Sequence, residues 1–370
     1  MAETLEKIVI KIGTISLTSP DGVSTETIKK LSDVITKLRT AGHLIVLVTS
    51  GAVGLGAKKL KLSQKPKTIL QKQSCAAVGQ ALLMQTYEKY FSKHDIPIAQ
   101  ILLTRDGLAQ REIYINARET ILELLEMNVL PIINENDAVA SEEIRFGDND
   151  MLSAMVSDLI SADRLIILTD EEGLFDSNPK KNKNAKIINL VENITPGIEK
   201  MAQGTGSEFS LGGMESKVQA AKLATSLGIK THIIHGEKPE NILNVIENKK
   251  IGTTFLPKSN TTEKRKRWIS HTLISKGTIY VDSGAQNAIT NNGKSLLPAG
   301  IKKVEGDFYR GDALEIFLIA SNKPFAKGIT NYSKTELEKI IGLKSTEIEK
   351  MLGYTYGETV IHRDDLVLLK

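Results

Sequence analysis

Short apolar runs alternate with amphipathic stretches over residues 1–255 of the chain. The runs are rich in Ile, Val and Leu, are flanked by Gly, Asp or Asn, and span residues 7–13, 43–51, 96–103, 128–133, 164–170 and 229–236. Continuous apolar runs are typical of strands that are buried on both faces. Between them, stretches such as 25–42 carry apolar residues at helical spacing, and Gly42 is a suitable end for that helix. The alternation predicts an α/β fold with an open, mainly parallel sheet sandwiched by helices.

The pattern changes toward the end of the chain. Residues 277–320 form short β-type runs separated by glycine-containing turns at 291–293 and 305–307. One helix-like stretch follows at 333–342, and the chain closes on another apolar run. These features predict a small β-rich barrel or sandwich. We therefore divide the chain into a first domain at 1–255, a linker at 256–274 and a second, β-rich domain at 275–370.

The formal net charge of +4 comes from one short segment. Residues 256–270 hold five basic residues and one acidic residue, whereas the parts on either side nearly balance their charges. This distribution predicts a basic linker and argues against a broadly basic surface for nucleic acid. Because affinity for nucleic acid depends largely on neutralising phosphates, the near-neutral segment 271–370 argues against RNA as its main partner.

Composition narrows the class of protein. A hydrophobic share of 41% and a charged share of 25% are ordinary for a soluble globular protein. The sequence has no apolar run of the ~18–20 residues that a membrane-spanning helix needs, and its start does not resemble a secretory signal. The single cysteine, Cys75, excludes an internal disulfide and fits a reducing compartment, so we expect a cytoplasmic protein. Its small neighbours on a predicted helix favour a packed core thiol over a reactive one.

Two glycine-rich segments run into predicted helices, TSGAVGLG at 49–56 and LGGMESK at 211–217. Backbone N–H groups in such turns, together with the partial positive charge of a helix N-terminus, bind anions. Many turns of this kind are purely structural, and neither segment matches a Walker motif or a dinucleotide fingerprint. Because ligands bind beyond the carboxyl ends of parallel strands, the two segments still favour a phosphate site of another kind.

Two lysines supply charge that phosphoryl transfer needs. Lys217 lies in the first turn of the helix predicted after GGM, where the helix dipole disfavours a cation unless an anion is close. Lys11 ends the first apolar run, where a lysine can also simply extend from the sheet into water. Together the two side chains can hold a transferring phosphoryl group from two sides.

The segment 134–152, NENDAVASEEIRFGDNDML, holds six carboxylates and three asparagines. A solvated loop, a metal cage and a pocket for a polar substrate all fit this composition. The segment lacks EF-hand spacing, and His232 and His235 have no acid or thiol beside them in sequence, so a dedicated metal site is disfavoured. If residues 148–150 are extended, Asp148 and Asp150 share one face and Asn149 lies on the other.

Six motifs in order along the first domain resemble the amino acid kinase family. They are KIGT (11–14), VTSGA (48–52), NENDAV (134–139), FGDND (146–150), LTDEEGLF (168–175) and GGMESK (212–217). NENDAV with FGDND resembles specifically those members that phosphorylate the γ-carboxylate of glutamate, whereas the other motifs are shared more widely. The region after the linker is similar to a PUA domain. The resemblance implies the amino acid kinase fold for the first domain.

The resemblance also implies roles for individual residues. Residues that match the glutamate pocket are Ser50, Asn134, Asp137, Asp148 and Asn149. Lys11 and Lys217 match lysines that stabilise the phosphoryl group, and Asp150 matches an acid that organises them. Residues that match the nucleotide site are Lys11, Thr169, Asp170, Leu211, Gly212, Gly213, Met214, Glu215, Ser216 and Lys217. Leu211 and Ser216 stand where family members commonly carry threonine, and Leu211 removes a possible hydroxyl contact to phosphate.

The implied reaction is attack of the glutamate γ-carboxylate on ATP, with Mg²⁺ bound mainly through the nucleotide, as the first step of proline synthesis. A carboxylate is already ionised at neutral pH, so no general base is needed. Implied partners are a glutamate-5-semialdehyde dehydrogenase that receives the product, proline as a feedback inhibitor, and further copies of the chain. Two alternatives stay open: a family member acting on acetylglutamate, aspartate or carbamate, and an RNA-binding protein that works through its PUA-like domain.

Overall fold

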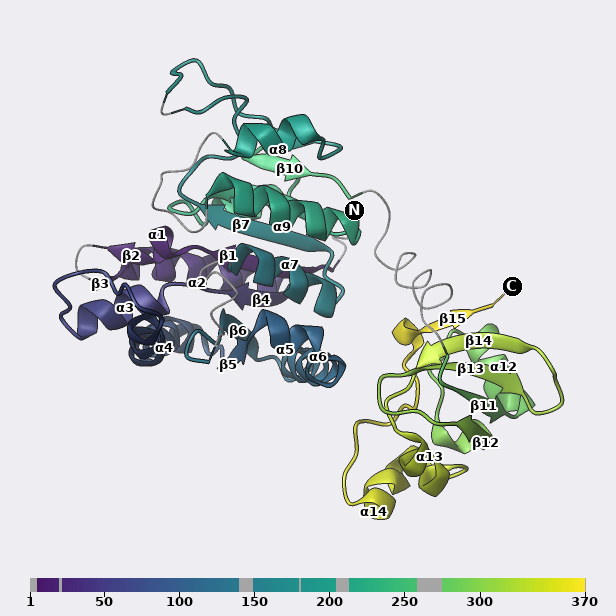
Figure 1. Ribbon diagram of the computed structural model, residues 1–370. Coiled ribbons are helices and arrows are strands. Elements are labelled where there is room, and N and C mark those ends of the chain that lie inside the picture. The colour runs from purple at the N-terminus through teal and green to yellow at the C-terminus, as the bar shows by residue number, and fades with distance from the viewer. Residues whose placement is uncertain are drawn as a thin grey trace. The chain divides into compact units, whose positions relative to one another are not determined.

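The computed structural model describes residues 5–19, 22–139, 149–179, 181–203, 213–257 and 275–369. The chain forms two compact units, Met1–Asn260 and Thr261–Lys370 (Figure 1). The division falls inside the predicted linker 256–274, of which residues 258–274 lie outside the described residues. No helix in the described part of the chain is both long and apolar enough to cross a membrane.

An eight-stranded sheet forms the centre of the first unit. Its strands, in spatial order, are β5 (Ile98–Leu103), β6 (Leu130–Glu135), β4 (Leu44–Val48), β1 (Lys7–Ile12), β7 (Arg164–Thr169), β9 (Lys230–His235), β10 (Thr253–Phe255) and β8 (Leu190–Val191). The first six are parallel, and β10 runs antiparallel to β9. These six are the six apolar runs of the sequence, so the predicted sheet is confirmed.

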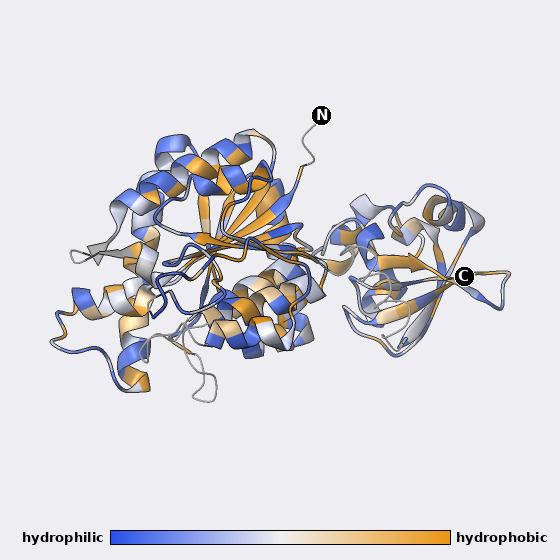
Figure 2. Ribbon diagram, turned by 90° about the horizontal axis from the view of Figure 1, so that it is seen from above, coloured by the Kyte–Doolittle hydropathy of each residue, from blue (hydrophilic) through white to orange (hydrophobic). Residues whose placement is uncertain are grey.

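Helices cover both faces of this sheet, which is apolar in its centre (Figures 1 and 2). They are α1 (Thr14–Leu17), α2 (Thr25–Thr40), α3 (Ala52–Lys59), α4 (Ile69–Phe91), α5 (Arg105–Ala109), α6 (Arg111–Glu126), α7 (Asn149–Leu159), α8 (Pro196–Gln203), α9 (Met214–Ser226) and α10 (Asn241–Ile246). A two-stranded ribbon, β2 (Thr18–Ser19) and β3 (Gly22–Val23), joins α1 to α2. The predicted sandwich is thus confirmed.

Successive side chains of β1 point to opposite faces of the sheet and therefore pack against different helices. Ile8, Ile10 and Ile12 belong to the core shared with α2, α4 and α10. Val9 belongs to the opposite core, shared with α6, α7 and α9. Because side chains two residues apart in a strand lie on one face, Lys11 shares the face of Val9. The strand therefore directs Lys11 toward α7 and α9.

The second unit is a small β-rich domain, as predicted. Its sheet has the order β12 (Ile301–Gly306), β11 (Gly277–Val281), β13 (Ala313–Leu318), β14 (Pro324–Ile329) and β15 (Leu366–Leu368). Its helices are α12 (Ser283–Thr290), α13 (Lys334–Ile340) and α14 (Ile348–Leu352). Helix α13 begins at a capping box of Ser333 and Glu336 within the predicted helical stretch. One apolar core joins its sheet and helices.

The structure contradicts part of the prediction that the glycines of TSGAVGLG (49–56) form an anion-binding turn. Gly51 has a φ of 102° and precedes α3, but Gly54 and Gly56 lie inside that helix. A Cβ on Gly56 would come within 1.7 Å of the carbonyl oxygen of Cys75, and one on Gly79 within 1.8 Å of that of Ala52. The interpretation of Gly56 as part of an anion cradle is wrong, because this glycine lets α3 and α4 cross closely. Cys75 is buried at that crossing, which confirms the predicted core thiol.

Candidate active site

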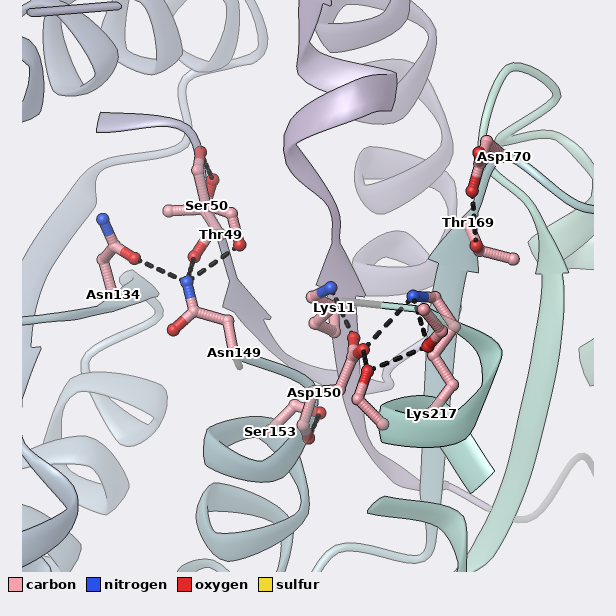
Figure 3. Close-up of polar contacts among 12 residues, drawn as sticks. Lys11, Thr49, Ser50, Asn134, Asn149, Asp150, Ser153, Thr169, Asp170 and Lys217 are labelled. Atoms are coloured by element: carbon pink, nitrogen blue, oxygen red, sulfur yellow. Dashed lines mark hydrogen bonds and ion pairs between the residues drawn. The ribbon is translucent and has the colours of Figure 1, made fainter. Parts of the chain in front are cut away.

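Lys11, Asp150 and Lys217 meet beside the carboxyl end of β1 (Figure 3). Lys11 Nζ forms an ion pair with Asp150 Oδ1, and Lys217 Nζ lies 3.3 Å from Asp150 Oδ2. The three side chains are only 7%, 1% and 6% exposed. Asp150 is in the first turn of α7 and Lys217 in the first turn of α9, so three elements distant in sequence build the cluster.

Electrostatics explain how these charges coexist in a buried place. Burial alone would raise the pKa of Asp150, but the charges of Lys11 and Lys217 and hydrogen bonds from Lys11 and Ser216 outweigh it and lower that pKa to about 2. Burial lowers the pKa of Lys217, and the charge of Asp150 opposes this shift. Two cations share one anion, which leaves a formal charge of +1 at the cluster. Such a site favours an additional anion.

Asn149 and Asp150 are consecutive residues whose side chains point in opposite directions (Figure 3). They form the start of α7 and are not extended, so the extended arrangement considered for this segment does not apply to these two residues. Asp150 accepts the hydroxyl of Ser216 at 2.7 Å, and a carboxylate in the first helical turn is also favoured by the helix dipole. The start of one helix thus separates a charged cluster from a neutral pocket.

The neutral pocket centres on the amide of Asn149. Its Nδ2 lies 2.7 Å from the carbonyl oxygen of Thr49, 2.8 Å from Ser50 Oγ and 2.9 Å from Asn134 Oδ1. Its Oδ1 is buried and accepts no hydrogen bond from any residue that the structure describes. An unpaired buried acceptor is costly, so this atom is suited to a donor on a ligand.

Asp137 lies two residues beyond β6 and is half-buried. Burial raises the pKa of its carboxyl group to about 6. A cation placed beside it would favour the ionised form and lower that pKa again. Its neighbour in the predicted pocket, Asp148, lies outside the described residues, as does the rest of the segment 140–148.

Thr169 ends β7 and Asp170 follows it, on the other side of the lysine cluster (Figure 3). The hydroxyl of Thr169 donates to Asp170 Oδ1 at 3.1 Å, and the N–H of Gly236 donates to the carbonyl oxygen of Thr169 at 2.6 Å. Three clusters of polar groups therefore lie along the carboxyl ends of neighbouring strands: the amide pocket, the lysines, and Thr169 with Asp170.

The chain is similar to known proteins over its whole length, and these similarities show its family. Residues 6–235 match the amino acid kinase family, and residues 277–352 match the PUA domain. A glutamate 5-kinase of Synechococcus sp. is 47% identical over 370 residues, which is all of both chains. A glutamate 5-kinase of Syntrophotalea carbinolica is 48% identical over 366 residues, 99% of this chain and 98% of its own. The chain belongs to the glutamate 5-kinases of the amino acid kinase family.

Among solved structures, UMP kinase from Bacillus anthracis is 14% identical, with a TM-score of 0.48 over 69% of this chain and 97% of its own. In this glutamate 5-kinase family member, the structure brings together Lys11, Asp150 and Lys217 in one cluster and Ser50, Asn134 and Asn149 in another. The specific role of each residue stays a prediction.

The predicted nucleotide loop is described only in part. Leu211 and Gly212 lie outside the described residues, while Gly213 precedes α9. Met214 is packed in the core, and exposed Glu215 accepts a hydrogen bond from Gln203 at 3.1 Å. Because these two side chains are engaged in such contacts, we expect any nucleotide contact at residues 214 and 215 to come from backbone N–H groups at the start of α9.

Two buried polar residues of α4 were missed by the sequence analysis. Gln80 accepts a hydrogen bond from Asn134 Nδ2 at 2.8 Å, and the hydroxyl of Tyr87 lies 2.7 Å from Thr49 Oγ1. They are seven residues apart, so they share one helical face. Their signal in the sequence was two hydrogen-bonding side chains at helical spacing on a face whose other buried residues are small or apolar.

Proposed function

We propose that this chain transfers the γ-phosphoryl group of ATP to the γ-carboxylate of L-glutamate. The products are ADP and L-glutamyl 5-phosphate, and the reaction is the first step of proline synthesis from glutamate. Full-length similarity to glutamate 5-kinases supports the proposal. The observation that carries it in the structure is a net positive lysine cluster directly beside a pocket with an unpaired amide oxygen.

The reaction asks the protein to bring two anions together. The attacking carboxylate is ionised at neutral pH, so the protein needs to position the reactants and screen their charge. Lys11 and Lys217 present two cations to the phosphoryl group as it moves between the two oxygens. Asp150 holds both lysines in place and, with its low pKa, stays ionised throughout the physiological range.

The neighbouring pocket suits the amino end of glutamate. An α-ammonium group donates up to three hydrogen bonds. Asn149 Oδ1 is the buried acceptor open to it, and the carboxylate of Asp137 supplies a negative charge. Because an N-acetylated substrate lacks this cation, the pocket should favour free glutamate over acetylglutamate.

The nucleotide side is formed by Thr169, Asp170 and the start of α9. In the described part of the chain, no three His, Cys, Asp or Glu side chains are grouped so as to hold a metal ion. We expect Mg²⁺ to be held chiefly by the phosphate oxygens of ATP, with few ligands from the protein. When bound, the ion would neutralise part of the phosphate charge. The lysines would act on the oxygens that remain.

Finer expectations accompany this function. The acyl phosphate product is labile, so we expect a glutamate-5-semialdehyde dehydrogenase to receive it in the cytoplasm. We also expect proline to act as a feedback inhibitor and the chain to form a homo-oligomer. Each rests on the family resemblance of the sequence.

A substrate panel tests the proposed function. ADP release is measured with ATP and Mg²⁺ in the presence of glutamate, aspartate, acetylglutamate or carbamate, and the acyl phosphate is trapped as its hydroxamate. We expect the largest kcat/KM with glutamate. A clear preference for another acceptor would move the chain to a different member of the family, and tight RNA binding without turnover would remove it from the kinases.

A further inference from the structure

A chain of side-chain amides leads away from the pocket into α4. Asn149 Nδ2 donates to Asn134 Oδ1 at 2.9 Å, and Asn134 Nδ2 donates to Gln80 Oε1 at 2.8 Å. Gln80 Nε2 then donates to Gln100 Oε1 at 3.2 Å. Asn134 is 1% exposed and Gln80 9% exposed, whereas Gln100 on β5 is exposed. The amide chain therefore runs from the buried pocket to the surface.

Backbone groups fix the direction of this amide chain. The carbonyl oxygen of Thr49 can only accept, so the nitrogen of the Asn149 amide must face it. The N–H of Glu135 can only donate, and it donates to Asn134 Oδ1 at 2.9 Å. With both amides oriented, Asn134 Nδ2 needs an acceptor, and in the described residues Gln80 provides it. Asn149 Oδ1 is thereby left facing the pocket.

Helix α4 also holds the other side of the Asn149 amide. Tyr87, fully buried, contacts the hydroxyl of Thr49, whose carbonyl oxygen accepts from Asn149. Gln80 and Tyr87 lie two helical turns apart on one face of α4. One helix thus supports two of the three acceptors of the Asn149 amide, Asn134 through Gln80 and Thr49 through Tyr87.

We propose that Gln80 is a positioning residue that, through Asn134, holds the Asn149 amide with its oxygen toward the α-ammonium group of the substrate. The inference rests on the proposed function, since it takes an α-amino acid to be the occupant of the pocket. Without an acceptor at residue 80, the Asn134 amide nitrogen is buried and unpaired, which favours rotamers that turn it toward water. Asn149 then loses a neighbour that fixes it, and glutamate binding weakens. The lysine cluster is not part of this amide chain, so phosphoryl transfer from bound substrate is unchanged.

The test compares Gln80→Met, which keeps the length of the side chain and removes its acceptor, with Gln85→Met on the exposed face of the same helix. Initial rates are measured with glutamate varied at saturating ATP and with ATP varied at saturating glutamate, alongside thermal unfolding. We expect Gln80→Met to raise KM for glutamate about tenfold, with kcat and KM for ATP within about twofold of wild type. Gln85→Met should match wild type throughout.

A third variant separates positioning from packing. Gln80→Glu keeps an acceptor for Asn134, and exposed Gln100 can turn its amide to donate to the new carboxylate, so KM for glutamate should return to near the wild-type value. If Gln80→Met leaves KM for glutamate unchanged, or changes kcat and both KM values together with the unfolding temperature, the inference is overturned. These outcomes presuppose an active wild type. A wild type without turnover of glutamate would instead refute the proposed function itself.

Discussion

Both ends of the central sheet bury a cluster of charged side chains. The two clusters differ in how their positive and negative charges are paired. At the amino end, Arg164 places Nε and Nη2 each 2.8 Å from an oxygen of Glu6. Its Nη1 contacts the carbonyl oxygen of Val245 at 3.1 Å and His232 Nε2 at 3.2 Å. The Arg164 guanidinium is thus paired one to one with the carboxylate of Glu6. At the carboxyl end, Lys11 and Lys217 both pair with the single carboxylate of Asp150.

The comparison shows that burial of charge does not by itself mark an active site. The Arg164 guanidinium has a paired, bidentate carboxylate and further acceptors, so this cluster is complete within the chain. The lysine cluster keeps an excess cation at the edge where ligands of parallel sheets bind. The first cluster should therefore contribute to stability, and the second to activity.

The largest expected effect is that of removing the shared anion. Asp150→Asn keeps the shape and an acceptor for Ser216 but leaves two buried lysines without a countercharge. We expect kcat/KM to fall by about 10³-fold or more in the coupled ADP assay, since two electrostatic contacts lose their geometry.

Glu6→Gln is the converse variant at the amino end. It breaks the pair with Arg164 and should lower the free energy of unfolding by about 1–3 kcal/mol, since Glu6 is only partly buried. Its kcat/KM at a temperature where it remains folded should stay near wild type. A loss of activity in Glu6→Gln similar to that in Asp150→Asn would remove the distinction between the two clusters.

Lys217→Met tests one cation of the pair. The loss of one donor to the transferring group predicts a decrease in kcat of about 10²-fold. Lys222→Met on the same helix is its control, because Lys222 is half-exposed and pairs with Glu199 on the surface. Steady-state kinetics that give the same kcat for both variants would exclude Lys217 from phosphoryl transfer.

The pH dependence of glutamate binding tests the pocket beside the cluster. With its pKa raised to about 6 by burial, Asp137 is ionised at pH 7 and mostly protonated at pH 5. The fall in its ionised fraction predicts a decrease of about tenfold in kcat/KM for glutamate across that interval. In Asp137→Asn, kcat/KM should be low and nearly constant over the same range. A wild-type profile that is flat from pH 7 to pH 5 would contradict this role.

Much of this arrangement could be predicted from the sequence because it depends on local patterns. The six apolar runs predicted the parallel strands, and the polar residues after them predicted which edge holds the site. The pairing of Gln80 with Asn134 could not be predicted, since it requires α4 to pack across β6, a contact between segments 54 positions apart. Gly56 was misread because a glycine that permits a close helix crossing has the same sequence signature as one that binds an anion. The helical start at Asn149 was missed because an acidic, asparagine-rich segment favours turns.

The smallest expected effect concerns His232 in the balanced cluster. Arg164 Nη1 can only donate, so His232 Nε2 accepts and its Nδ1–H donates to Thr254 Oγ1 at 3.0 Å. Burial, then the charges of Arg164 and Lys230, lower the pKa of His232 well below its usual value. The unfolded chain therefore binds a proton near pH 6.5 that the folded chain does not, and stability falls as pH drops below that value. The slope contributed by this residue approaches about 1.4 kcal/mol per pH unit at most.

Denaturant unfolding between pH 7 and pH 5.5 should show a smaller loss of unfolding free energy in His232→Gln than in wild type, because the glutamine amide can make both contacts without titrating. If the two proteins lose stability in parallel, His232 is not the group that limits stability in acid.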